Sequence, residues 1–87
     1  MYQKVTTKTT IMDKKIAIVK KSLTDKIKYL LFTEEINSNM DNLIIAHIKT
    51  PMTISMNHMM EIAKEIGASD VEVDAKGPCK YTIFFYC

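Results

Sequence analysis

The chain has 87 residues, of which 47% are hydrophobic and 25% charged, and its formal net charge is +2. This composition excludes a disordered protein and predicts a single domain over residues 1–87, with residues 1–12 a loose leader or an edge strand. The apolar runs are far shorter than the roughly 20 residues that cross a bilayer. The first ten residues lack the apolar segment of a signal peptide. We therefore expect a cytoplasmic protein with no membrane partner.

The charge is distributed unevenly along the chain. All twelve basic residues are lysines, so the chain has no guanidinium group for two-pronged recognition of phosphate or guanine. Residues 1–32 hold eight lysines and two acidic residues, a balance of +6, whereas residues 33–87 hold four lysines and eight acidic residues, a balance of −4. Such an asymmetry can steer the protein toward a charged partner.

The first half of the chain predicts one strand and one ambiguous segment. Residues 14–21, "KKIAIVKK", are a short apolar run between lysines and predict a strand. Residues 22–37 fit a helix capped by Ser22, with an apolar stripe formed by Leu23, Ile27, Leu30 and Leu31. They also fit a strand in "KIKYLLFT" that pairs with the first one. We favour the helix, and the sequence leaves both alternatives open.

The second half is more clearly patterned. Residues 37–42 predict a loop, and residues 43–50, apolar on both faces, predict a central strand. A helix is expected from Thr53 or Ser55 to Ile66, with Gly67 as its left-handed cap. Residues 70–75 and 79–87 predict a hairpin. The expected fold is therefore a small two-layer α+β domain, a mixed sheet of about five strands with two helices packed on one face.

A cluster of sulfur and imidazole side chains lies in residues 47–61, which contain two histidines and four methionines. At about 100° per residue, the methionines share one stripe with Ala63 and Ile66, and His58 points away toward Glu61 and Glu65. Sulfur ligands spread along a stripe do not converge on a soft metal, whereas methionine commonly fills gaps in a core. We therefore expect core packing and no metal site.

His47 and the two cysteines are further candidate ligands. His47 shares a strand face with Leu43 and Ile45, where it could bond a neighbouring side chain or act as a proton carrier, and the sequence does not decide its role. Cys79 and Cys87 lie too far apart along one strand to form a disulfide, so free thiols are expected. Together with the histidines they match no standard zinc spacing.

The strongest interaction signal is the C-terminal segment "YTIFFY". Alternation places Phe84 and Tyr86 on the face opposite to the core, where exposed aromatic side chains are typical of an interface. Glu72 and Asp74 share one face of the preceding strand. We expect these four residues to contact a protein partner. If the last strand lies at the edge of the sheet, it could also pair with a second copy to form a homodimer.

A nucleic-acid-binding regulator is the alternative function. Its phosphate contacts would come from the lysine-rich first half, and Tyr29, Tyr81 or Phe84 would stack on exposed bases. The acidic second half and the absence of arginine count against it. The candidate phosphate-binding residues are Lys14, Lys15, Lys20, Lys21, Lys26 and Lys28.

Catalytic and cofactor motifs are absent from the sequence. It has no Gly-rich phosphate loop, no G-x-S-x-G, no C-x-x-C and no H-E-x-x-H, so we expect neither an enzyme nor a cofactor. The expected function is stoichiometric binding of a protein of unknown identity. The small size and the composition, rich in Ile, Lys, Asn and Met, further favour a phage or mobile-element product that blocks a host protein, such as an anti-CRISPR-like factor.

Overall fold

The centre of the molecule is a strand with two different faces, β3 (Leu43–Lys49). Its alternate residues Ile44, Ala46 and Ile48 are fully buried, whereas Leu43 and Ile45 are only half-buried on the opposite face. This alternation is typical of a strand that packs against helices on one side only. The central strand predicted for residues 43–50 is therefore confirmed.

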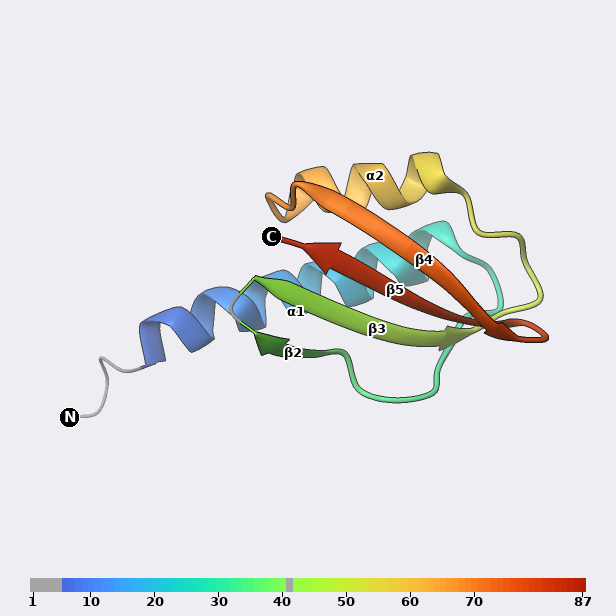
Figure 1. Cartoon of the computed structure of the whole chain (residues 1–87), viewed down its shortest axis with the longest axis horizontal. Coiled ribbons are helices and arrows are strands. Elements are labelled where there is room, and N and C mark those ends of the chain that lie inside the picture. The colour runs from blue at the N-terminus through green and yellow to red at the C-terminus, as the bar shows by residue number, and fades with distance from the viewer. Residues whose placement is uncertain (1–5, 41) are drawn as a thin grey trace.

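The computed structural model describes residues 6–40 and 42–87 and places two helices on one face of a five-stranded sheet (Figure 1). β3 lies between β5 (Lys80–Tyr86) on one side and β1 (Leu31–Phe32) and β2 (Asn37–Met40) on the other. β4 (Asp70–Gly77) pairs with the far side of β5 and forms the edge. The predicted α+β class, with about five strands and two helices, is confirmed.

Two features of the predicted sheet are wrong. The sheet is antiparallel in every pairing of the described residues, not mixed, because β5 returns from the β4–β5 hairpin and inserts between β4 and β3. For the same reason the last strand is not at an edge. Both of its sides are paired within the chain, so a homodimer cannot form by pairing along this strand.

The first helix, α1, runs over Thr6–Lys26, so the strand predicted for residues 14–21 is wrong. Buried side chains recur there with the spacing of a helix, at Met12, Val19 and Leu23. This buried stripe packs α1 against the sheet. These tertiary contacts override the strand propensity of the β-branched residues in the segment. Within residues 1–12, the predicted leader or edge strand is helical from Thr6, and residues 1–5 lie outside the described part.

Neither alternative for residues 22–37 is right as predicted: Ser22 lies inside α1 and does not cap a helix, and the strand within this segment pairs with β3, not with residues 14–21. The helix continues to Lys26, and a turn at Tyr29, with a left-handed φ of 56°, leads into β1. The loop predicted for residues 37–42 is replaced in part by β2, a short strand with an irregular register against β3. Short polar strands of this kind lack the hydrophobic alternation that would identify them in the sequence.

The second helix, α2 (Met56–Glu65), agrees with its prediction. The Ser55 side chain accepts a hydrogen bond from the His58 N–H at 3.4 Å, and Gly67 takes the left-handed conformation, with φ of 75°, after the helix. Polar contacts tie it to α1 near the end of both helices. Ser22 Oγ donates to Glu65 Oε1 at 2.7 Å, and Lys26 Nζ lies 2.9 Å from Glu61 Oε1.

The core fills the space between the helices and one face of the sheet. Leu23 of α1, Met59 and Ile62 of α2, and Ile83 and Phe85 of β5 are all completely buried there. In Figure 1 the sheet lies in front of α1, and α2 runs along its β4 side. No helix of the described residues covers the opposite face of the sheet, which we call the open face.

Candidate functional site

Strand register determines which side chains share the open face. In β3 and β5, Ile45 lies opposite Phe84, and Leu43 lies opposite Tyr86. In β5 and β4, Phe84 lies opposite Glu72, while Tyr86 lies opposite Asp70 and Thr82 opposite Asp74. Three parallel rows result: an aliphatic row on β3, an aromatic row on β5 and an acidic row on β4. These rows consist of Leu43 and Ile45; Phe84 and Tyr86; and Asp70, Glu72 and Asp74.

The aromatic row is held in place by contacts within the face. The rings of Phe84 and Tyr86 stack with their centroids 6.4 Å apart and an angle of 22° between their planes. Tyr86 donates its hydroxyl to Glu72 Oε1 at 2.7 Å. This hydrogen bond raises the pKa of Tyr86, since it stabilises the protonated hydroxyl, and nearby carboxylates raise it further. The aromatic and acidic rows are therefore joined by a direct hydrogen bond.

The acidic row occupies the edge strand. Glu72 and Asp74 are exposed, and Val71 and Val73 turn to the helix side, as the alternation of the sequence predicts. At the end of the row, Lys76 Nζ lies 3.7 Å from Asp74 Oδ2. An exposed pair of this kind contributes little to stability. The row therefore presents carboxylates to solvent beside an apolar surface.

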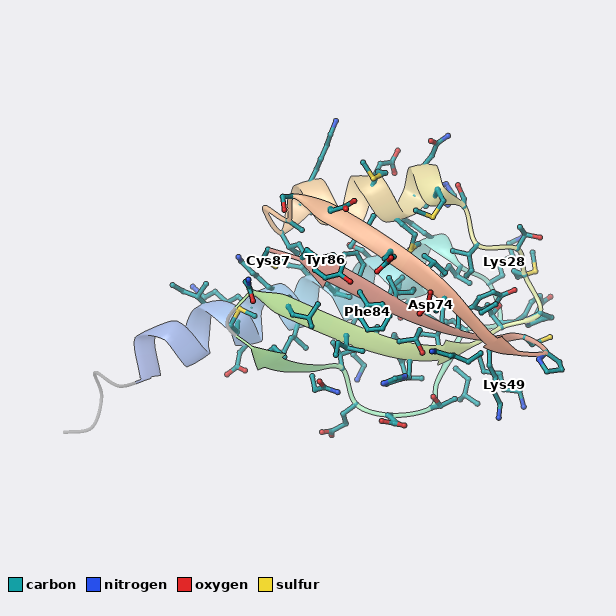
Figure 2. All side chains as sticks on the ribbon, in the orientation of Figure 1. Lys28, Lys49, Asp74, Phe84, Tyr86 and Cys87 are labelled. Atoms are coloured by element: carbon teal, nitrogen blue, oxygen red, sulfur yellow. The ribbon has the colours of Figure 1, made fainter. Side chains whose placement is uncertain are left out.

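The four predicted contact residues thus come together on one surface. Figure 2 shows Asp74, Phe84 and Tyr86 on the open face of the sheet, and register adds Glu72 beside Phe84. Tyr86 is 37% exposed, and Phe84 is half-buried. Their role in binding remains a prediction, whereas their shared location follows from the register.

Sequence reasoning missed three members of this surface, Leu43, Ile45 and Asp70. The strand that contains Leu43 and Ile45 is apolar on both faces, which predicted burial on both. Their half-exposure arises because no helix covers that side. Asp70 could have been found from its spacing, since it lies two residues before Glu72 and thus on the same face.

His47 lies on the open face with Leu43 and Ile45, as predicted, at the end nearer the β4–β5 turn. Its Nδ1 lies 3.1 Å from Thr82 Oγ1, and its Nε2 lies 3.9 Å from Glu34 Oε1. The histidine borders a depression of about 270 Å³, which Lys76, Lys80 and Tyr81 also line. The His47 ring therefore contacts neighbouring polar side chains. This agrees with the interpretation of His47 as a half-buried histidine bonded to a neighbour.

The six lysines of the alternative function do not form one surface. At about 100° per residue, Lys14 and Lys21 lie on the side of α1 opposite to its buried stripe, and Lys15 and Lys20 fall on different flanks. Two lysines already have partners: the ammonium group of Lys20 lies 5.8 Å from the Phe32 ring centroid, and that of Lys26 is bonded to Glu61. The remaining member, Lys28, lies just beyond the helix and is exposed.

Of the proposed base-stacking residues, Phe84 is separated from these lysines by the sheet, whereas Tyr29 directly follows Lys28. Phe84 lies on the open face, whereas α1 packs against the opposite face. Tyr81 shares its side of β5 with Ile83 and Phe85 and belongs to the helix layer, and Tyr29 is 77% exposed in the turn after α1. A single strand of nucleic acid could not contact the α1 lysines and stack on Phe84 in one short groove.

The methionine cluster is only partly core. Met59 is completely buried, but Met52 is 39% exposed, and Met56 and Met60 are each 46% exposed. The predicted common core-facing stripe is therefore wrong. The helix begins at Met56, so Met52 precedes it, and the buried arc is the narrower one around Met59 and Ile62.

The described residues contain no group of three or more histidine, cysteine, aspartate or glutamate side chains that could hold a metal ion. Cys79 and Cys87 are free thiols, as predicted.

A second depression, of about 580 Å³, lies between α1 and the β1–β2 connection and is lined by Ile16, Lys20 and Phe32.

No family model, curated protein or solved structure matches this chain. Neither helix in the described part of the chain has the length and hydrophobicity to span a membrane.

Proposed function

We propose that the protein binds a partner protein stoichiometrically through the open face and catalyses no reaction there. The observation that carries the proposal is the row arrangement, in which partly exposed Phe84 and Tyr86 lie between aliphatic and acidic rows on a sheet face that no described helix covers. Aromatic side chains with a polar rim are the usual energetic centre of a protein interface.

The charge of the face favours protein over nucleic acid. Asp70, Glu72 and Asp74 run alongside the aromatic row, so a nucleic acid whose bases stacked on Phe84 and Tyr86 would bring its phosphates beside three carboxylates. The phosphates and these carboxylates are both negatively charged and would repel each other. A basic protein surface would instead be attracted, and an acidic face could imitate the phosphates of a nucleic acid for a partner that normally binds one.

The finer proposal is that the chain blocks a host protein on behalf of a phage or mobile element, as anti-CRISPR-like factors do. Its support is the small size, the lysine-only basic residues and the content of Ile, Asn and Met. A basic nucleic-acid-binding surface on such a host protein is the kind of target that the acidic row fits by charge.

A pull-down of the tagged protein from host lysate, with and without nuclease, followed by mass spectrometry, tests the proposal. We expect a stoichiometric protein partner that survives nuclease and is lost at least about tenfold with Phe84→Thr, because truncating a central aromatic side chain commonly costs 2 kcal/mol or more.

The matched control is Tyr29→Asn, which removes an exposed aromatic side chain from the turn after α1, outside the three rows, at a left-handed position that Asn tolerates. It should capture the partner normally. Capture that vanishes with nuclease, or that is equal for wild type and Phe84→Thr, would contradict the proposal.

A further inference from the structure

The edge strand β4 has an outer side that no other strand of the described residues occupies. β4 is the last strand in the order β1-β3-β5-β4, and at eight residues it is the longest strand of the sheet. Native proteins usually shorten or protect such an edge, because its free backbone groups are a template for another strand. A long edge strand beside the candidate site is therefore a second feature of the same surface.

The hydrogen bonds of β5 show which backbone groups of β4 face outward. Cys87 donates its N–H to Asn42 O at 2.8 Å on the β3 side, so the preceding residue, Tyr86, directs its backbone groups to β4. The register pairs Tyr86 with Asp70, Phe84 with Glu72 and Thr82 with Asp74, so these three β4 residues direct their backbone groups toward β5. By alternation along β4, the N–H and C=O groups of Val71, Val73 and Ala75 point away from β5.

One of these outward donors is already satisfied. The Val71 N–H donates to the carboxylate of its own neighbour, Asp70, at 2.8 Å. The outward groups of Val73 and Ala75 lie further along the strand, before the irregularity between Ala75 and Gly77. An added strand would therefore pair along the segment that contains Val73 and Ala75.

The side chains on the two faces of this edge define the chemistry of an added strand. On the open face, Asp70, Glu72 and Asp74 would lie about 4.5–5.5 Å from the residues opposite them in a new strand, a distance at which opposite charges stabilise the pair. Basic side chains at alternate positions of the incoming strand match this row. The acidic row therefore favours an incoming strand with basic side chains on the open face.

On the helix side of the sheet, α2 presents two exposed methionines. Glu61 and Glu65 of α2 contact α1, and the helical step places Met56 and Met60 about 100–180° around the axis from them, on the side away from α1. Both methionines are 46% exposed. Flexible methionine side chains adapt to varied apolar partners, so the intervening residues of an added strand would be apolar.

We propose that β4 accepts an extended segment of the partner protein as an additional strand, with basic and apolar residues alternating along that segment. This deepens the proposed function and rests on it. Main-chain hydrogen bonds to Val73 and Ala75 provide the pairing, and the acidic row provides the specificity. A second copy of this chain is a poor occupant, because pairing two β4 edges would place two acidic rows side by side.

The test uses a capped synthetic peptide in which lysine alternates with valine, and a control peptide of the same composition with all lysines in one block. Added to the full chain, the alternating peptide should slow amide hydrogen exchange of Val73 and Ala75 at least about tenfold, because their outward N–H groups become bonded. The block peptide should not. Equal effects of the two peptides would overturn the proposal.

A backbone variant gives an independent test. Ala75→Pro removes an outward N–H without removing a bond to β5, since proline is tolerated where an edge residue faces solvent. It should weaken binding of the alternating peptide about tenfold or more, whereas Ala75→Thr, which keeps the N–H, should not. Unchanged binding by a folded Ala75→Pro protein would overturn strand addition.

The same variants separate this inference from the function on which it rests. If Phe84→Thr loses the partner captured from lysate while Ala75→Pro keeps it, the open face binds the partner and strand addition is wrong. If both variants lose the partner and Ala75→Thr keeps it, both proposals are supported. If both variants keep the partner, both proposals are wrong.

Discussion

At the residue scale, Tyr86 connects the aromatic and acidic rows. Its ring stacks on Phe84, and its hydroxyl donates to Glu72. The sequence indicated that Phe84 and Tyr86 share a face and that Glu72 and Asp74 share a face. It did not indicate that the two faces are the same one, since that depends on the pairing of β4 with β5.

The pKa of Tyr86 offers a direct check of this contact. We expect the pKa of Tyr86 to lie above the ordinary tyrosine value. Glu72→Val should lower this pKa, because it removes the hydrogen bond, which is the larger cause, together with the nearby negative charge. Tyrosine ring resonances followed by NMR against pH would measure it. The control Asp13→Asn, on α1, should leave the titration of Tyr86 unchanged.

The sign of the linked stability follows from the raised pKa. The folded state holds the Tyr86 proton more tightly than the unfolded state does, so this contribution is fully present below the ordinary tyrosine pKa, about 10. It is lost as the pH rises through the higher folded value. A titration of Tyr86 that is identical in wild type and Glu72→Val would show that the hydrogen bond does not persist in solution.

At the element scale, α1 is the part of the fold that the sequence misrepresented. Its segment "KKIAIVKK" has the composition of a strand, but only Val19 of its apolar residues is completely buried, while Ile18 is 38% exposed. The helical conformation is therefore stabilised by a narrow stripe of buried side chains that packs on the sheet. Most helical stability in proteins comes from such packing and not from local propensity.

Substitution of Leu23 tests whether this stripe holds α1 in place. Leu23 is completely buried, so Leu23→Ala should lower the free energy of unfolding by about 2–5 kcal/mol through lost burial and a cavity. Urea denaturation followed by circular dichroism would measure the change. The matched control Ile18→Ala lies on the same helix but is 38% exposed, and it should cost clearly less. Equal losses for the two variants would contradict the packing described.

At the scale of the whole molecule, the lysine-rich α1 and the acidic row of β4 lie on opposite sides of the sheet. Two other acidic residues, Glu61 and Glu65 of α2, lie on the helix side and bond to α1. The linear asymmetry of the sequence is therefore kept in space by α1 and β4 only. A partner attracted by the acidic row would approach the open face, away from most of the lysines.

Charge reversal on the helix side distinguishes this arrangement from the nucleic-acid alternative. Lys14→Glu combined with Lys21→Glu changes two exposed lysines opposite to the buried stripe of α1. We expect the association rate with a captured protein partner to change less than about twofold, whereas Glu72→Gln with Asp74→Asn should lower it, more strongly at low salt. Biolayer interferometry would measure both. A larger loss with the lysine variant would assign binding to the α1 surface.

The sequence by itself determined the α+β class, the central strand 43–49, the start and end of α2, and the hairpin of β4 and β5. These depend on local signals: an uninterrupted apolar run, a Ser cap with a left-handed Gly, and strict alternation. Only the tertiary structure decided that residues 6–26 are helical, that β5 lies inside the sheet and that β4 forms its edge. Strand order and burial arise from contacts between distant residues, and no local pattern encodes which face of a two-sided apolar strand is left uncovered.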